Sequence, residues 1–183
     1  NKRRKIITAV AVAAIFTGAL KAGVEISERA FKNIKNVILP PGGISPKRLL
    51  NKCLNCNLCV NACPNKIIKK ADSNFGAIHL EYGFGKYCEY GCKKCSEVCP
   101  SGALKRLSEK EKQNTRIAMA VINKDKCLSC GICEKKCPKE AIKSDDAGKR
   151  EIESSKCIGC GKCAKICRPK AIEIYGIKEQ TII

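Results

Sequence analysis

Residues 127–138 read Cys127-Leu-Ser-Cys130-Gly-Ile-Cys133-Glu-Lys-Lys-Cys137-Pro138. Three cysteines stand three residues apart, and a fourth follows one helical turn later, directly before a proline. On a tight loop this spacing directs three thiolates toward three corners of one iron–sulfur cube, whereas the fourth cysteine points away toward a second cube. The stretch therefore predicts binding of 4Fe–4S clusters.

The same spacing occurs in four places along the chain and uses all 16 cysteines. One copy is longer by one residue in its first gap, namely the copy that begins at Cys88. The four sets are Cys53, Cys56, Cys59 and Cys63; Cys88, Cys92, Cys95 and Cys99; Cys127, Cys130, Cys133 and Cys137; and Cys157, Cys160, Cys163 and Cys167. No cysteine is missing or left over, so the sequence predicts four 4Fe–4S clusters as cofactors.

Two other uses of cysteine fit this pattern less well. A disulfide framework has no reason to repeat one four-cysteine spacing four times. Zinc sites favour paired C-x2-C units separated by a longer gap, and each such site closes as a tetrahedron. The repeated run of three cysteines plus one therefore favours clusters over both alternatives.

The segments between the cysteine sets predict two similar modules. Around the last two sets we expect strands at 117–122 and 171–174 and a hairpin of 141–143 with 151–153. A hairpin of 67–70 with 77–81 is expected between the first two sets. The predicted fold class is α+β, with tandem bacterial two-cluster ferredoxin-like modules at 49–107 and 117–183 that follow an N-terminal helix. The charged stretch 108–116 is expected to be a solvent-facing loop or short helix that links the modules.

Two assignments of the fourth cysteine remain open at this stage. Exchange within each module gives the following cluster ligands: Cys53, Cys56, Cys59 and Cys99; Cys88, Cys92, Cys95 and Cys63; Cys127, Cys130, Cys133 and Cys167; Cys157, Cys160, Cys163 and Cys137. The competing arrangement exchanges the fourth cysteine between the first and fourth sets and between the second and third. His79, the single histidine, stands in a predicted strand away from the cysteine loops and is not expected to be a ligand.

The first 48 residues are of a different character. Residues 1–23 combine a basic start, which contains Arg3-Arg4, with an uncharged run up to Leu20, as in a twin-arginine export signal or a membrane anchor. An uncleaved anchor is the preferred interpretation. Residues 24–38 show an amphipathic helical pattern, and Pro40-Pro41-Gly42-Gly43 then begins an extended connector that completes the segment 24–48.

The formal net charge of +19 falls to about +11 once four clusters, each contributing about −2 with its thiolates, are included. A basic surface of this kind suits an acidic redox protein or anionic lipid, although a merely solvated lysine-rich surface explains it too. Nucleic acid is not expected, because the lysines are scattered and few aromatic side chains are available to stack on bases.

Several stretches resemble the NapG/MauM-type polyferredoxins. They are Pro40-Pro41-Gly42, Leu49-Leu50, the run from Val98 to Leu104, and Arg116 to Ile122, together with the twin-arginine-like start. Arg168, between Cys167 and the following proline, departs from the pattern of this family. The resemblance implies a membrane-associated, exported electron-transfer protein that connects a quinol-oxidising membrane protein with a periplasmic reductase or dehydrogenase.

No motif in the sequence indicates catalysis. Nucleophile–base pairs, phosphate loops and dinucleotide fingerprints are all missing from the sequence. We therefore expect a non-catalytic electron relay, membrane-anchored on the periplasmic side. The alternative is a polyferredoxin subunit of a molybdenum, tungsten or nickel oxidoreductase, on the cytoplasmic face.

Overall fold

The structure is a computed structural model that describes residues 37–70, 77–83 and 85–183. The chain divides into residues Asn1–Lys35 and Asn36–Ile183, so that every described residue belongs to the second unit. The expected anchor at 1–23 lies outside the described residues. So does most of the expected helix at 24–38, although Val37 and Ile38 are described and belong to no helix. Within the described ranges, no helix is long and apolar enough to cross a membrane.

The first module contains three short helices and one hairpin. Its elements are α2 (Pro46–Lys52), α3 (Leu58–Ala62), β1 (Ile68–Lys70), β2 (Ile78–Leu80) and α4 (Lys94–Glu97). The side chain of Ser45 caps α2 by accepting a hydrogen bond from the backbone N–H of Arg48, and Pro46 fits the first turn, where its missing N–H is not needed. β1 and β2 pair antiparallel with Ile68 opposite Leu80, which confirms the hairpin predicted there.

The second module repeats this plan with longer strands. Its elements are α5 (Glu109–Asn114), β3 (Thr115–Ile122), α6 (Ile132–Lys136), β4 (Ile142–Ser144), β5 (Arg150–Ile152), α7 (Lys162–Ile166) and β6 (Ile172–Ile182). β4 and β5 form the predicted hairpin, and β6 is the predicted partner of β3. β6 also continues well past residue 174, where the sequence pattern had ended it, and pairs as far as Ile182 with Thr115.

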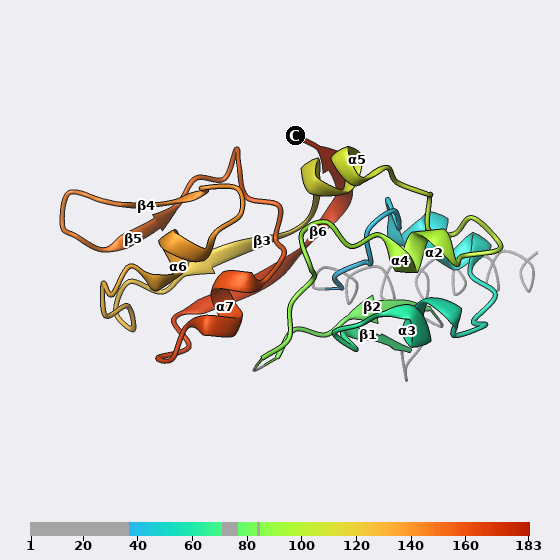
Figure 1. Ribbon diagram of the computed structural model, residues 1–183, viewed down its shortest axis with the longest axis horizontal. Coiled ribbons are helices and arrows are strands. Elements are labelled where there is room, and N and C mark those ends of the chain that lie inside the picture. The colour runs from blue at the N-terminus through green and yellow to red at the C-terminus, as the bar shows by residue number, and fades with distance from the viewer. Residues whose placement is uncertain (1–36, 71–76, 84) are drawn as a thin grey trace, which may run out of the picture. The chain divides into compact units, whose positions relative to one another are not determined.

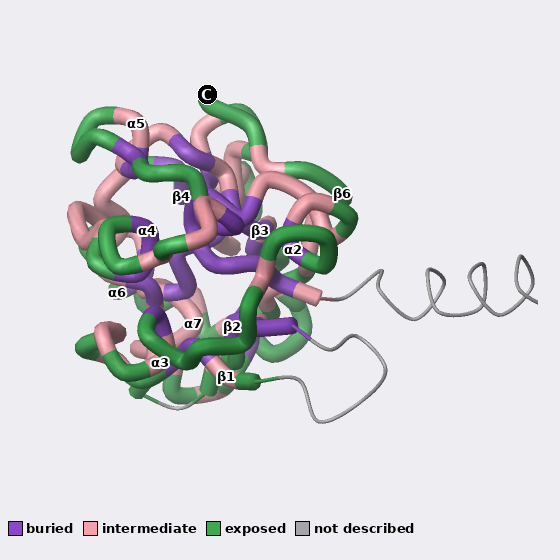
Figure 2. The backbone as a smooth tube through the Cα atoms, turned by 90° about the vertical axis from the view of Figure 1, so that its right-hand side faces the viewer, coloured by how far each residue is buried: buried purple, intermediate pink, exposed green. Residues whose placement is uncertain are grey.

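The β3–β6 ribbon connects two hydrophobic cores (Figure 1). Ile117 and Ala118, at the start of β3, belong to the core of the first module, whereas Ala120 belongs to the core of the second. Ile174 of β6 packs against both cores. In Figure 2 the buried backbone runs through the interior along β3, while most of α2, apart from Leu49, and much of β4 are exposed. The two modules therefore share one continuous pair of strands.

The proline- and glycine-rich segment is buried. Residues 38–43 are all buried. The side-chain amide of Gln180, in β6, donates to the carbonyl oxygens of Leu39 and Pro40 and accepts from the N–H groups of Gly42 and Ile44. Because a buried backbone group needs a partner, this amide, together with backbone hydrogen bonds to the carbonyl oxygens of Ile38, Pro40 and Gly42, explains how a chain so rich in turn residues lies inside the protein.

The charged stretch after the first module is also less exposed than expected. It forms α5, which begins with a capping box in which Ser108 and Glu111 satisfy each other's backbone N–H groups. Most of its charged side chains lie at least partly in solvent, but Lys112 is fully buried. A short helix was one of the two forms expected here, whereas a solvent-facing segment was wrong at Lys112.

Candidate metal centres

Four cavities are each lined by four cysteines. Cavity A is lined by Cys53, Cys56, Cys59 and Cys99; cavity B by Cys63, Cys88, Cys92 and Cys95; cavity C by Cys127, Cys130, Cys133 and Cys167; cavity D by Cys137, Cys157, Cys160 and Cys163. Each set combines three cysteines of one motif with the last cysteine of the other motif in the same module. All 16 cysteines are used once.

The cavities suit one cofactor repeated four times. Each is lined by three cysteines of one motif and one of another, and their remaining walls are mainly apolar. Four thiols around an apolar cavity are the donor set of a 4Fe–4S cube, so the residues fit that group.

Two left-handed residues shape each regular cysteine loop. The residue before the second cysteine has positive φ in three of the motifs (Asn55, Ser129 and Gly159, at 52°, 57° and 70°), and so does the residue after it (Asn57, Gly131 and Gly161, at 62°, 70° and 79°). Asparagine, serine and glycine tolerate this backbone better than bulky or β-branched residues. The lengthened loop of Cys88–Cys95 shows no such pair.

The fourth cysteine of each motif begins a common turn. Its third successor has positive φ in all four motifs, at Lys66, Gly102, Glu140 and Lys170. The chain then donates backbone N–H groups back to sulfur: Ala141 to Cys137 at 3.4 Å, Ala171 to Cys167 at 3.3 Å and Leu104 to Cys99 at 3.4 Å. Such N–H···S bonds favour negative charge on the sulfur and help to set a cluster's reduction potential.

Glycine in a cysteine loop has no side chain to keep the backbone away from a bound cube. Gly131, Gly159 and Gly161 do line cavities C and D. Their close contacts, however, are with other protein groups. A Cβ at Gly159 would lie 2.2 Å from the carbonyl oxygen of Ala118, and one at Gly161 would lie 2.5 Å from the ring of Tyr82. These glycines thus also allow β3 and Tyr82 to pack against the loop around cavity D.

Burial makes several of these thiols hard to ionise in the protein alone. Burial raises the pKa of Cys59 and of Cys88 to about 11, and it raises the pKa of Cys95 and Cys163 further. Cys99 is an exception: although burial opposes it, the N–H of Leu104 and the hydroxyl of Ser101 lower its pKa. Because metal ligation requires thiolates, loading the buried sites must release protons.

Cavities B and D meet at the boundary between the modules. The N–H of Cys88 donates to the carbonyl oxygen of Cys160 at 2.8 Å, which connects a wall of B directly to a wall of D. Tyr82 lies at the same place, where its hydroxyl donates to Gly159 O at 2.9 Å. Burial, followed by the nearby Cys88 and Cys160, raises the pKa of Tyr82. We call this contact the B–D junction.

Within each module the two cavities are also neighbours. In the first module α3 packs against α4. The pKa of the Cys95 thiol in cavity B is raised by burial, then by Cys88 and Cys92, and also by Cys59 of cavity A, so these two cavities are close. In the second module α6 packs against α7. The cavities therefore follow one another in the order A, B, D, C.

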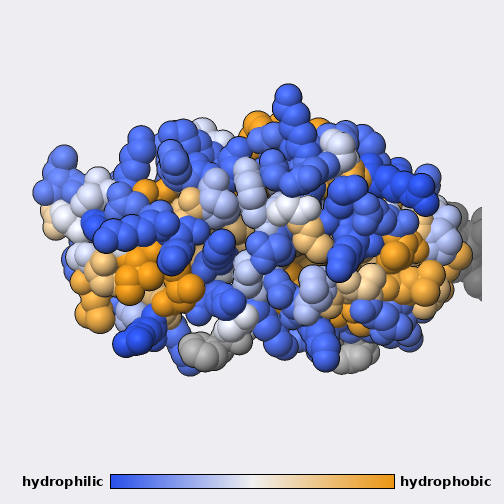
Figure 3. Space-filling view, in the orientation of Figure 1, coloured by the Kyte–Doolittle hydropathy of each residue, from blue (hydrophilic) through white to orange (hydrophobic). Residues whose placement is uncertain are grey.

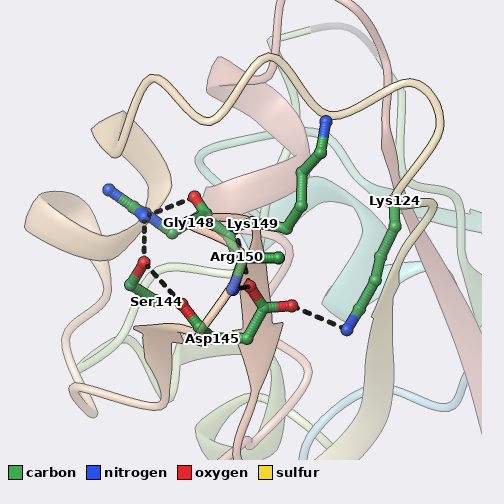
Figure 4. A network of polar contacts seen from close by, with 7 residues as sticks. Lys124, Ser144, Asp145, Gly148, Lys149 and Arg150 are labelled. Atoms are coloured by element: carbon green, nitrogen blue, oxygen red, sulfur yellow. Dashed lines mark hydrogen bonds and ion pairs between the residues drawn. The ribbon is translucent and has the colours of Figure 1, made fainter.

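A polar network borders cavity C at the β4–β5 turn (Figure 4). Asp145 accepts hydrogen bonds from Lys124 and from the turn, and Arg150 donates to Ser144 and Gly148. Lys149 reaches the carbonyl oxygen of Cys127 at 2.9 Å. The backbone N–H of Arg150, aided by both basic side chains, lowers the pKa of Cys127. The network thus places two cations beside cavity C.

Cavities A and C are the more exposed pair. Cys56 in A and Cys130 in C are the two exposed cysteines of the chain. The residues one position after the first cysteine of these motifs, Leu54 and Leu128, are 68% and 74% exposed, whereas the equivalent Ile158 of cavity D is 2% exposed. The face drawn in Figure 3 is mainly hydrophilic, with apolar patches toward its two ends.

Two residues near the cysteines were not indicated by the sequence pattern. Tyr82 follows an ordinary hairpin, and Lys112 is one lysine in a charged run; folding brings Tyr82 to Gly159 and Lys112 to Glu89, the residue after Cys88. His79 lies in β2 and lines none of the four cavities.

Two family models match the chain, and both are described as a 4Fe-4S dicluster domain. One matches residues 52–103 and 87–141, and the other matches residues 119–168. The chain belongs to the 4Fe–4S dicluster ferredoxins. These matches span all 16 cysteines, which agrees with the two cavities found in each module.

This dicluster ferredoxin is similar to several curated proteins. It is 31% identical to the ferredoxin-type protein NapG of Escherichia coli, over 78% of this chain and 66% of NapG. It is 32% identical to the methylamine utilization ferredoxin-type protein MauM of Methylorubrum extorquens, over 74% of this chain and 66% of MauM. The polyferredoxin protein MvhB of Methanothermobacter marburgensis is 33% identical over 55% of this chain and 23% of MvhB. The predicted NapG/MauM-type resemblance is thus confirmed, and the chain is a ferredoxin-type iron–sulfur electron-transfer protein.

Proposed function

We propose that the chain carries electrons along four 4Fe–4S clusters that occupy cavities A, B, D and C in that order. The observation that carries this proposal is the 2.8 Å hydrogen bond from Cys88 N–H to Cys160 O, because it connects one module's inner cavity to the other's. Without such a link, the modules would be two separate two-cluster carriers. With it, one electron path crosses the whole described chain.

The bound clusters would supply one-electron oxidation and reduction. The protein's own part is to hold, space and shield them. The cysteines would act as ligands in the four sets that line the cavities. Apolar walls keep water from the inner cavities, and the backbone N–H groups of Leu104, Ala141 and Ala171 stabilise sulfur charge in A, D and C respectively.

The ligand sets are tested by pairs of substitutions in the full chain. If the fourth cysteines are exchanged within each module, Cys63 and Cys92 bind the same cluster. The double variant Cys63→Ala/Cys92→Ala should then keep three intact clusters, the same number as either single variant. If motif one instead exchanges with motif four, the double variant damages two clusters and leaves two. Anaerobic iron and sulfide analysis, with EPR of the reduced protein, counts the clusters; the wild type should hold about 16 iron atoms.

A second pair serves as the control. Cys59→Ala with Cys63→Ala damages two clusters under either arrangement and should leave two intact. A Cys63/Cys92 variant that matches this control overturns the proposed ligand sets. A wild-type chain that never holds more than two clusters overturns the four-cluster relay itself.

Electrons would enter and leave at cavities A and C. The exposed Cys56 and Cys130, with Leu54 and Leu128 beside them, bring the outer two clusters nearer to a partner than the inner two. Electron exchange between proteins weakens steeply with distance, so exposed cluster ligands favour these ends. The basic character of the chain favours acidic redox proteins as partners.

The cellular setting rests on the resemblance rather than on the described residues. We propose a membrane quinol-oxidising protein on one side and a reductase or dehydrogenase on the other, with residues 1–23 as export signal and membrane anchor. Replacing Arg3 and Arg4 with lysine keeps their charge but removes a twin-arginine signal. We expect cluster-loaded protein to stay in the cytoplasm. Export of the double-lysine variant at the normal level would contradict the twin-arginine route.

The alternative is a subunit of a molybdenum, tungsten or nickel oxidoreductase on the cytoplasmic face. Purification under mild conditions distinguishes the exported relay from the cytoplasmic oxidoreductase subunit. Stable association with a large metal-containing catalytic subunit, together with cytoplasmic location, supports the alternative and opposes the exported relay.

A further inference from the structure

Lys112 is the one charged side chain that is fully buried among the described residues. Its Nζ donates to the carbonyl oxygens of Glu89 and Tyr90, both at 3.3 Å. No described Asp or Glu forms an ion pair with it. Two carbonyl groups satisfy hydrogen bonds but bring no negative charge, so the buried ammonium lacks a counter-ion in the polypeptide.

The negative charge that is missing from the polypeptide would come from the cysteine sets on either side. Glu89 and Tyr90 directly follow Cys88 of cavity B. The N–H of Cys88 in turn donates to the carbonyl oxygen of Cys160 of cavity D at 2.8 Å. The ammonium therefore lies against the stretch that joins cavity B to cavity D, next to the B–D junction.

We infer that Lys112 is the shared counter-charge of the two inner clusters and raises both of their reduction potentials. This inference rests on the proposed four-cluster relay. Each cluster that takes one electron gains one unit of negative charge. A fixed positive charge stabilises that added electron, and weak dielectric screening in a buried site strengthens the effect. Because Lys112 lies next to the B–D junction, between the two inner cavities, it would hold the middle of the relay ready to receive electrons from either end.

Lys112→Met tests this in the full cluster-loaded chain, because methionine keeps the length of the side chain and removes its charge. A redox titration monitored by EPR should show that, relative to the wild type, two of the four reduction waves shift to lower potential and two stay unchanged. At a fixed potential near the midpoint, the ratio of reduced to oxidised inner cluster should fall at least tenfold, which corresponds to about 59 mV for a one-electron couple. Adding Cys63→Ala, which removes cluster B, should eliminate one of the two shifted waves.

Lys110→Met is the matched control. Lys110 lies in the same helix and carries the same charge, but it is exposed. Water and salt screen an exposed charge, so all four waves should stay in place. Equal shifts in the two variants would show an effect of overall charge and would overturn the role of Lys112.

Lys112→Gln separates charge from hydrogen bonding, since its amide still donates to carbonyl oxygens. We expect it to shift the same two reduction waves; wild-type potentials in this variant would overturn the inference.

If neither neutral variant retains the inner clusters, Lys112→Arg decides between charge and packing. Recovery of all four clusters in the arginine variant supports a requirement for positive charge, whereas continued loss of the inner clusters assigns Lys112 a role in packing alone. If a neutral Lys112 variant keeps four clusters and its reduction waves do not shift, the inference about Lys112 is refuted but the four-cluster relay is not. Fewer than four clusters in the wild type would refute the relay itself.

Discussion

Gly159 and Gly148 have nearly the same left-handed backbone but very different surroundings. Their φ angles are 70° and 75°; a Cβ at Gly159 would lie 2.2 Å from Ala118 O, whereas one at Gly148 would meet nothing within 4 Å. Gly148→Ala should lower the free energy of unfolding by about 1–2 kcal/mol, the strain of the backbone alone. Gly159→Ala should cost about 1–3 kcal/mol more, because β3 must move.

Anaerobic guanidinium unfolding of the two cluster-loaded variants measures this difference. Because both positions carry the same backbone strain, subtracting one result from the other isolates the steric contact. Equal destabilisation of the two variants would contradict the close packing of the Gly159 loop against β3.

At the scale of single residues, the sequence predicts the cysteines far better than their neighbours. The spacing of the cysteines is local, because a tight loop followed by one helical turn decides where four thiols point. Tyr82 and Gly159 are 77 positions apart and meet only through tertiary packing. The burial of Lys112 cannot be predicted from the sequence either, because lysines in a charged run are usually solvated.

Helix α5 is too short to be stable by itself and depends on its cap. Ser108 accepts a hydrogen bond from the N–H of Glu111, and the N–H of Lys112 donates to Ser108 O at 2.9 Å. Ser108→Ala should destabilise the helix by about 1 kcal/mol. Amide hydrogen exchange at Lys112 and Gln113 should then quicken by about fivefold.

Ser108→Thr provides the comparison, since threonine retains a capping hydroxyl. It should leave exchange in α5 close to the wild-type rate. Unchanged exchange in Ser108→Ala would mean that tertiary contacts alone hold this helix in place.

At the scale of elements, hairpins and the closing strand were predictable, whereas the proline-rich segment was not. Alternating apolar residues around the turn at 145–148 indicate β4 and β5 directly. Pro40 to Gly43 have the composition of a loop, and in its buried position this segment exchanges four hydrogen bonds with the distant Gln180, two donated and two accepted by its side-chain amide. A pattern within one segment carries no information about such a partner.

At the scale of the whole molecule, the clusters would form the inner walls of both cores. The first core includes Cys59, Cys88 and Cys95, and the second includes Cys133 and Cys157. Removing iron with a chelator should therefore unfold both modules, with loss of amide exchange protection in β3 and β6. A chain that stays protected after complete iron removal would show that its apolar contacts suffice.

The hydrogen bonds of Gln180 have a consequence for biosynthesis. Gln180 is translated 138 residues after Gly42, the group whose N–H it binds. Every cysteine of cavities A and B is in place once Cys99 has been made, but the carbonyl of Cys160 and the amide of Gln180 come much later. On the ribosome, the nascent chain thus holds the cysteines of cavities A and B before it holds the groups that connect them to cavity D and to β6. The proposed electron path would therefore become continuous only late in synthesis, well after the cysteines of its first half have been made.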